Sequence, residues 1–382
     1  MNNSWSFRVN NYNAINETFD VDFLKQEIGS RFPFYDMKIM DKAILFFCTL
    51  DHHQMTHQFD EIRRALSVKG YIPFLRHERG EHIIYVMKKP KKKEKSIWIN
   101  IALLIGVIIT TTITGSLLHI GVNDLYSLAD LSTVLLPDNL INGIVFFSLP
   151  LLSILFVHEM GHYFISKKHG IQTSLPFFIP IPPILPGFNI GTFGALISSN
   201  DPMPNKKALF DVGISGPLAG FIVAIPVTII GLITSATYIP ESMIGGEELV
   251  LGNSILFSIL TQLFITIPEG FYIDLNPIAF AGWIGLLITS INLLPAGQLD
   301  GGHIFRAVFG DKQKYASWIA IFIMIFTGWI FFAFLIILVI GTSHPPPLYD
   351  EGSLDIKRKI LFIVAVLILI ICFIPDPIML MN

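Results

Sequence analysis

The sequence predicts an α-helical polytopic membrane protein with about six transmembrane helices, preceded by a small soluble α+β domain. Two observations support this fold class. Of the 382 residues, 52% are hydrophobic and only 14% are charged, a composition far more apolar than that of a soluble domain. The apolar residues also gather into runs of about 20 residues, the length that crosses a bilayer, and these runs begin only after residue 96.

The first 87 residues have the pattern of a soluble α+β domain. Helical periodicity and strand-like apolar segments occur there in short stretches separated by turn residues. No set of residues with catalytic spacing occurs in this part. The expected helices cover 20–28 and 54–68, and the expected strand pairs cover 37–50 and 71–87.

Residues 88–96 form a basic linker that precedes the membrane-embedded part, residues 97–382. Lys88–Lys95 contains six lysines immediately before the first apolar run. Such a block marks the cytoplasmic side of a first span, so the N-terminal domain is expected to be cytoplasmic.

Six spans are expected, and their alternation places both ends of the chain on the cytoplasmic side. The apolar segment 249–266 is interpreted as an interfacial or re-entrant helix, because a further span would invert everything after it. The loops 120–140 and 234–275 lack Lys and Arg and are expected to be external, whereas Lys357–Lys359 breaks this charge pattern. The expected spans are 97–119, 141–165, 208–233, 276–294, 315–340 and 359–378.

An H-E-x-x-H motif lies at the end of the second apolar run, at His158, Glu159 and His162. Ionisable residues are costly at membrane depth, so their presence there indicates a function. Positions i and i+4 share one face of a helix, which allows both histidines to bind one zinc ion. Glu159 can then reach a water molecule on the metal without being a ligand itself.

A catalytic zinc site needs a third protein ligand, and Asp300 is the best candidate. It follows the fourth apolar run in a segment broken by Pro295 and Gly297. Broken backbone at membrane depth occurs where it lines a site. Asp300 and the two histidines are each expected near the cytoplasmic end of a span, so they can meet at one depth.

These motifs resemble those of the site-2 protease family of intramembrane zinc metalloproteases, over roughly residues 97–382. The family's N-x-x-P-x-x-x-x-D-G stretch is matched by Asn292, Pro295, Asp300 and Gly301. Residues 191–195, 216–220 and 344–347 also fit the family. The resemblance implies that Asp300 is the third zinc ligand and that Glu159 is the general base.

The expected function is hydrolysis of peptide bonds in locally unwound transmembrane segments of membrane-anchored proteins, with one zinc ion per chain. By the resemblance, cleavage releases a regulatory domain to the cytosol. The expected partners are a membrane-anchored substrate and the lipid bilayer. No nucleic acid is expected, and the sequence does not decide between a monomer and an oligomer. The chain is expected to be a multi-pass protein in the cell membrane of a prokaryote, specifically an archaeon.

Several alternatives stay open at this point. The same His, Glu and Asp residues would suit a transporter of divalent cations, although that function favours polar residues spread along several spans. Asn292 either positions the substrate backbone or stabilises developing oxyanion charge, or it joins two helices by a hydrogen bond. His303 is interpreted as a cytoplasmic-face histidine or a neighbour of the ligands, and His344 as a structural residue of an external loop. The N-terminal domain is expected to modulate the reaction without being needed for its chemistry.

Overall fold

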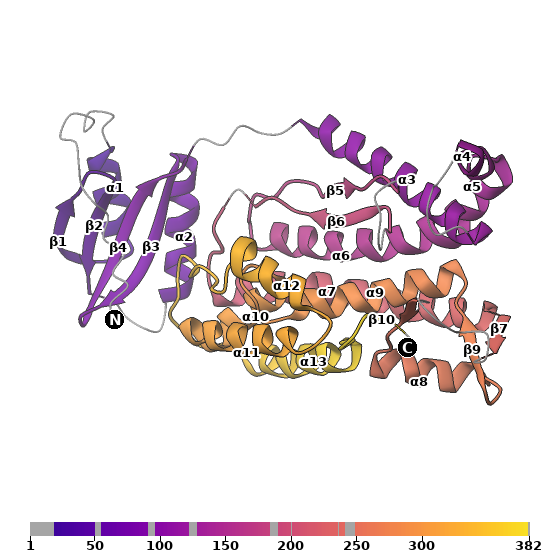
Figure 1. Cartoon of the computed structure of the whole chain (residues 1–382). Coiled ribbons are helices and arrows are strands. Elements are labelled where there is room, and N and C mark those ends of the chain that lie inside the picture. The colour runs from indigo at the N-terminus through magenta and orange to yellow at the C-terminus, as the bar shows by residue number, and fades with distance from the viewer. Residues whose placement is uncertain are drawn as a thin grey trace. The chain divides into compact units, whose positions relative to one another are not determined.

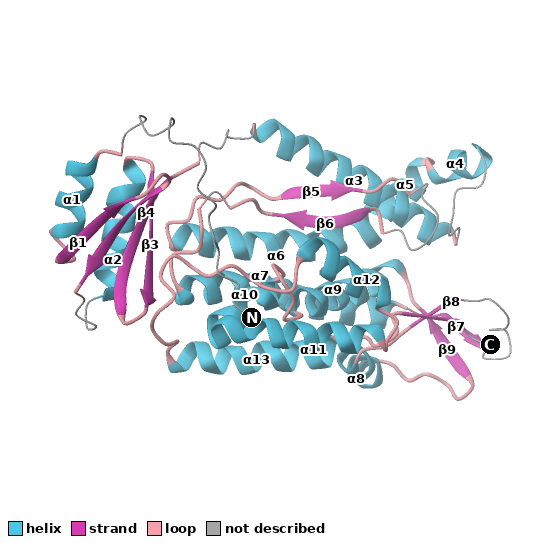
Figure 2. Cartoon of the chain, turned by 60° about the vertical axis from the view of Figure 1, so that its left-hand side comes forward, coloured by secondary structure: helices cyan, strands magenta, loops and turns pink. Residues whose placement is uncertain are grey.

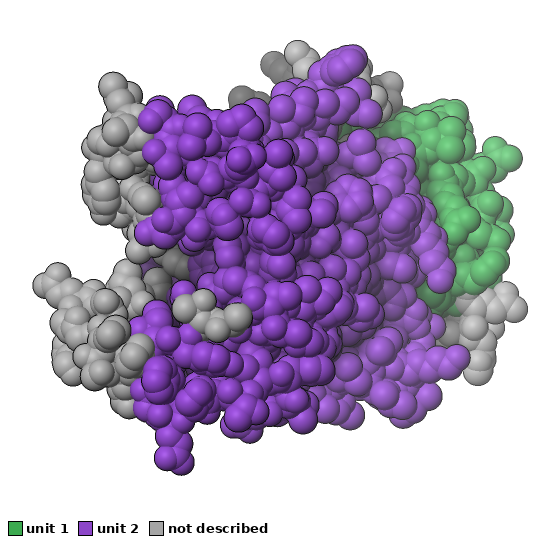
Figure 3. All heavy atoms as spheres, turned by 90° about the vertical axis from the view of Figure 1, so that its right-hand side faces the viewer, with its two compact units in different colours: residues 1–93, 202–206, 346–352 green, residues 94–201, 207–345, 353–382 purple. Residues whose placement is uncertain are grey.

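The computed structural model describes residues 19–49, 55–90, 96–121, 128–183, 190–199, 201–235, 237–240 and 249–380 (Figure 1). Residues 91–95 of the basic linker lie outside these ranges. The chain forms two compact units (Figure 3). The N-terminal unit contains residues 1–93, 202–206 and 346–352, and the membrane unit contains the rest.

The N-terminal unit is built on a four-stranded antiparallel sheet in the order β1-β2-β4-β3 (Figure 1). The turn between β3 and β4 falls at Arg79 and Gly80, which both have positive φ, at 53° and 85°. That combination is typical of the tight turns that match strand twist in a hairpin. The strands are β1 (Phe34–Ile39), β2 (Ala43–Cys48), β3 (Tyr71–Glu78) and β4 (Glu81–Lys88).

Helices α1 (Val21–Gly29) and α2 (Met55–Val68) pack their apolar stripes on one face of this sheet. Asp20 caps α1 by accepting a hydrogen bond from the Phe23 amide. The stripe of α2 and the alternating residues of β2 and β4 form one core, as the predicted α+β pattern requires. Its fully buried members include Leu24, Ile28, Ile44, Phe46, Ile62, Leu66, Leu75, Ile84 and Val86.

Three helices of the described residues are long and apolar enough to cross a membrane. They are α3 (Ile97–Ile120), the continuous helix Pro137–Lys168 and α7 (Lys206–Thr234), which match the first three expected spans. The second comprises α5 (Pro137–Gly143), a π-helical turn (Ile144–Ser148) and α6 (Leu149–Lys168), and the short α4 (Leu128–Val134) precedes it.

A β-hairpin lies along α3, as the two ribbon views show (Figures 1 and 2). Its strands are β5 (Phe177–Pro180) and β6 (Thr192–Leu196). The side-chain amide of Asn100 donates to the carbonyls of Leu175 and Pro176, both at 2.9 Å, and Thr110 Oγ1 donates to the Gly191 carbonyl at 2.6 Å. These bonds satisfy backbone groups that would otherwise be costly beside an apolar helix.

The segment between α7 and α9 contains short strands and one ten-residue helix, α8 (Ile255–Phe264). Ten residues are too few for α8 to cross a bilayer by itself, and the interfacial or re-entrant role of 249–266 is still a prediction. Strand β7 (Thr237–Pro240) pairs with β9 (Phe271–Asp274), and β8 (Leu249–Leu251) pairs with β10 (Ile378–Leu380).

The fourth and sixth expected spans correspond to 17-residue helices, α9 (Pro277–Leu293) and α13 (Ile356–Cys372). This length is near the lower limit of about 17 residues for a span. Between them lie α10 (Asp300–Phe309), a 3₁₀ turn (Gly310–Lys312), α11 (Gln313–Ile325), α12 (Ile330–Leu335) and a π-helical end (Ile336–Ile340).

The expected fifth span, 315–340, is wrong as a single helix. The chain turns between α11 and α12, and both helices pack together with Leu294 and Ala296. The two ends of this helical hairpin meet: Gln313 Nε2 donates to the Pro295 carbonyl at 3.0 Å, and its Oε1 accepts from the His344 amide at 3.1 Å. The helical hairpin therefore begins and ends on the same side of the membrane unit. Hydropathy missed the turn because its residues, 326–329, include only one polar side chain, that of Thr327.

Because of this hairpin, α13 begins on the opposite side of the membrane unit from the side that six alternating spans would give. Arg358, in the first turn of α13, donates from Nε to Asp211 Oδ1 near the start of α7 at 2.7 Å. His169, just beyond the end of α6, contacts the same carboxylate at 3.0 Å. The far end of α13 continues into β10, beside β8 in the segment between α7 and α9. Helix α13 thus begins beside the end of α6, and the lysines around Arg358 lie on that side.

Candidate metal centre

Helix α6 carries two of the three predicted ligands on one face. His158 and His162 lie one helical turn apart, and their ring centroids are 4.9 Å from each other. They retain only 4% and 9% of their surface exposure. The i, i+4 spacing alone brings the two imidazoles to a common point.

Asp300 is the first residue of α10, directly after the irregular stretch that follows α9. The next two residues are glycines whose backbone lies against that stretch. A β-carbon at Gly301 would overlap the carbonyl oxygens of Leu293 and Leu294, and one at Gly302 would overlap the carbonyl oxygen of Gly297. The two glycines therefore allow the start of α10 to pack closely against the irregular stretch that precedes it. This close packing fixes the position of Asp300.

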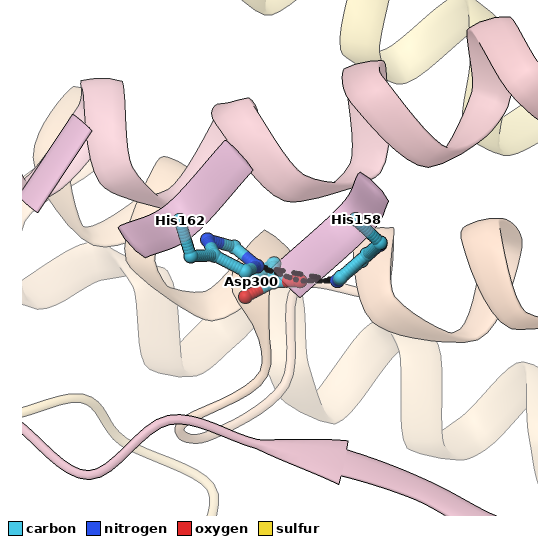
Figure 4. Close-up of side chains that lie close together, drawn as sticks. All are labelled: His158, His162 and Asp300. Atoms are coloured by element: carbon cyan, nitrogen blue, oxygen red, sulfur yellow. Dashed lines mark hydrogen bonds and ion pairs between the residues drawn. The ribbon is translucent and has the colours of Figure 1, made fainter. Parts of the chain in front are cut away.

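The three side chains converge on one point (Figure 4). Asp300 Oδ2 lies 3.3 Å from His158 Nε2 and 3.2 Å from His162 Nε2, and the two Nε2 atoms are 3.2 Å apart. Ligand atoms about 2.0 Å from a tetrahedral zinc ion would be about 3.3 Å apart, from the tetrahedral angle alone. Two imidazoles and a carboxylate at this spacing fit zinc and leave a fourth position for water.

Helix α7 orients one of the two histidines. His162 Nδ1 donates to the carbonyl oxygen of Val212 at 2.8 Å, which leaves the Nε2 lone pair directed toward the metal position. Such a bond on the far ring nitrogen fixes both the tautomer and the orientation of a metal-binding histidine.

The same helix makes room for both rings with glycine. A β-carbon at Gly216 would overlap His162 Nε2, and one at Gly220 would lie 3.1 Å from the β-carbon of His158. Sequence reasoning noted this segment only as a family motif and missed its role. The four-residue spacing of the glycines matches that of the histidines, which was the available signal.

Glu159 lies beside His158 on α6 and is 7% exposed. It is not among the three groups that converge on the metal position. A buried carboxylate next to a ligand suits a base that exchanges protons with water at the metal.

Asn292 lies in the last turn of α9 and is half-buried. In the described part of the chain, its side chain makes no hydrogen bond to His158, His162 or Asp300. Its predicted roles, contact with substrate or a bond between helices, are therefore still predictions.

His303 and His344 lie together, and the expected position of His344 is wrong. Their ring centroids are 4.2 Å apart, although His344 was expected in an external loop far from the metal depth. The helical hairpin of α11 and α12 returns the chain to the side of α10 and so brings His344 back. Burial and the neighbouring His303 lower the pKa of His344 to about 3, so its ring is neutral at physiological pH. His303 Nδ1 donates to the Leu299 carbonyl at 3.0 Å.

The sequence profile of peptidase family M50 matches residues 146–336, half of the chain. The chain is also similar to probable chloroplastic zinc metalloproteases of plants. It is 29% identical to EGY1 of Oryza sativa subsp. japonica over 241 residues, covering 59% of this chain and 39% of that protein. It is 34% identical to EGY2 of Arabidopsis thaliana over 171 residues, covering 42% and 28%.

A third relative, EGY2 of Oryza sativa subsp. indica, is 30% identical over 277 residues, which cover 67% of this chain and 49% of that protein. The chain thus spans less than half the length of these relatives. No solved structure matches it.

Proposed function

Because the chain belongs to peptidase family M50, the site-2 protease family, we propose that it is an intramembrane zinc metalloprotease. The observation that carries this proposal is the convergence of His158, His162 and Asp300 at tetrahedral spacing. The three residues come from two segments 138 residues apart in sequence, which the fold brings together at a helix that matches a membrane span. One zinc ion per chain is the expected content.

The proposed chemistry divides the work between ligands and base. A bound zinc ion supplies a Lewis acid that polarises the scissile carbonyl and lowers the pKa of a water ligand to about 7. Glu159 accepts the proton of the attacking water and then donates it to the leaving amine. His162 is held in the metal-binding tautomer by Val212, so no ligand must reorient during the reaction. Asn292 is proposed to position the substrate backbone or to stabilise oxyanion charge.

The proposed substrate is a transmembrane segment that unwinds locally, because an intact helix hides its amides from attack. The hairpin of β5 and β6 supports this substrate class. It lies between α3 and α6, the metal-bearing helix, and presents Phe193 and Leu196, which are 70% and 63% exposed. An unwound strand can pair with such an edge and bury side chains on it.

The wider setting is proposed from the sequence and its charges. The protein is placed in the cell membrane of a prokaryote, with its N-terminal domain in the cytosol, where cleavage releases a regulatory domain of a membrane-anchored protein. The hairpin of α11 and α12 supports this orientation, because the lysines around Arg358 then fall on the same side as those beside the start of α7.

A transporter of divalent cations is less well supported. Transport through a membrane needs polar groups along a path, whereas the described residues contain one cluster of metal-binding groups.

The proposal is tested by purifying the protein, incorporating it into lipid vesicles and supplying a model membrane-spanning substrate. Cleavage should stop when zinc is removed by a chelator and return when zinc is added back. The His158→Ala variant should be inactive under all conditions. Cleavage that survives complete zinc removal would contradict the proposal.

A further inference from the structure

The N-terminal unit contains two short segments from far along the chain, residues 202–206 and 346–352. The first precedes α7 and the second lies between the α11–α12 hairpin and α13. Both are ordered parts of the unit's structure.

Residues 348 and 349 extend the sheet at the edge of β3. Tyr349 pairs with Leu75 in parallel orientation, and the Leu75 amide donates to the Leu348 carbonyl at 2.9 Å. The guanidinium of Arg76 donates to the same carbonyl at 2.8 Å. At Leu75, the edge of β3 is therefore paired with a distant segment of the same chain.

The side chains of this segment complete the unit's core. Leu348 and Tyr349 are 2% and 6% exposed and belong to the same cluster as the residues of α1, α2 and the sheet. The Tyr349 ring lies 5.7 Å from that of Phe59, and its hydroxyl is 3.5 Å from the sulfur of Met55. Glu351 lies 3.4 Å from His82 of β4.

Residues 203–205 add to the other side of this segment. The Leu348 amide donates to the Met203 carbonyl at 2.8 Å, and the Tyr349 amide donates to the Pro204 carbonyl at 2.9 Å. We call β3, residues 348–349 and residues 203–205 together the clasp. It fastens two distant segments to one sheet edge.

Each fastened segment leads within a few residues to a helix of the membrane unit. Residues 202–206 run directly into α7, which begins at Lys206, and residues 346–352 precede α13, which begins at Ile356. Arg358 in the first turn of α13 bonds to Asp211 in the second turn of α7. The residue after Asp211 is Val212, whose carbonyl holds His162.

We propose that the clasp is a positioning device for the metal centre, through which the N-terminal unit holds the start of α7 and, with it, the carbonyl that orients His162. This inference rests on the proposed zinc site. The clasp gives a physical route for the modulating role expected of the N-terminal domain. Displacement of residues 348–349 from β3 releases the segments that precede α7 and α13. The carbonyl that orients His162 is then held less firmly, and the geometry of the metal site becomes less well fixed.

Hydrogen–deuterium exchange and zinc affinity test the proposal in the full-length protein. Tyr349→Ala removes the buried ring of the clasp, and Tyr35→Ala is the matched control because Tyr35 is 61% exposed on β1 of the same unit. Tyr349→Ala should speed exchange in 71–78 and in 207–214 and weaken zinc affinity about tenfold, as loss of a ligand's orienting partner does. Tyr35→Ala should leave all three unchanged.

A second variant that lacks residues 1–87 removes the clasp completely and should give the same changes in 207–214 and in zinc affinity. The proposal is overturned if either variant releases the segment while exchange at the start of α7 and zinc affinity stay at wild-type values. It is equally overturned if Tyr349→Ala leaves the exchange of 71–78 unchanged. Failure of the unaltered protein to bind zinc would contradict the proposed function instead, and the exchange data would still judge the clasp.

Discussion

At the residue scale, the candidate metal centre depends on the absence of side chains at several glycines as well as on the proposed ligands. Gly216 and Gly220 of α7 face the two histidines. Gly301 and Gly302 allow the start of α10 to pack closely against the backbone of the segment that precedes it. These positions fix where the imidazoles and the carboxylate lie before any ion binds. Preorganisation of this kind stabilises a metal site because little ordering of the ligands is needed on binding.

Substitution of Gly216 tests this packing directly. Gly216→Ala places a methyl group where His162 Nε2 lies, so the ring must turn away. We expect zinc affinity to fall about tenfold or more. Gly220→Ala should have a smaller effect, because its β-carbon would lie at a tight but tolerable 3.1 Å from His158. Competition with a chromogenic chelator measures both. Equal affinities in the two variants and the wild type would show that the glycines do not shape the site.

Removal of Asp300 tests the third ligand. Asp300→Ala should retain far less zinc than the wild type after gel filtration, because two histidines alone hold the metal weakly. The control is Asp311→Ala, whose side chain is 95% exposed and lies beyond the end of α10. Full zinc content together with full activity in Asp300→Ala would mean that another residue is the third ligand.

At the element scale, the helical hairpin of α11 and α12 changes the membrane topology that we predict for the rest of the chain. It starts and ends beside Pro295, and Gly328 at its turn donates to the Pro375 carbonyl at 3.1 Å. Because the hairpin returns, we expect α13 to cross the membrane in the opposite direction to that of the sixth expected span. The residues after α13 should therefore be external, the reverse of the sequence-based expectation.

Cysteine labelling in intact cells or sealed vesicles checks this topology. Lys207→Cys and Lys359→Cys should react from one side of the membrane, and Glu269→Cys and Pro375→Cys from the other. Background should be low, because Cys48 and Cys372 are buried free thiols and burial raises the pKa of Cys48 to about 12. Labelling of Lys359→Cys and Pro375→Cys from the same side would contradict the crossing of α13.

Local spacing predicted those parts of the fold and site that depend on neighbours in sequence. The H-E-x-x-H spacing placed His158 and His162 on one face of α6, and turn residues located the hairpin of β3 and β4. The contact of Val212 with His162 was not predictable, since a backbone carbonyl has no residue-type signature. The turn at Gly328 was missed because the residues around it are mostly apolar, and Thr327 is the one polar side chain of the turn. The charges at Lys357–Lys359 already disagreed with an alternation of six spans.

At the scale of the whole molecule, the two compact units are not two consecutive stretches of sequence. Residues 202–206 and 346–352 fold with the N-terminal domain. The expected linker at 88–96 did not include these two later segments in that domain. A sequence pattern cannot reveal such returns, because each segment is only a few residues long. The clasp predicts that regulation through the N-terminal domain acts on metal affinity.

The measurement that tests the central claim most directly is zinc content and substrate cleavage, determined on the same preparations of wild-type protein and Glu159→Gln. Both should contain about one zinc ion per chain, because the role proposed for Glu159 is that of a base and not of a ligand. Cleavage by the variant should fall by roughly 100-fold or more, the typical contribution of a general base. Zinc lost in proportion to activity would make Glu159 a ligand, and undiminished cleavage would remove it from the reaction; either result would contradict the account.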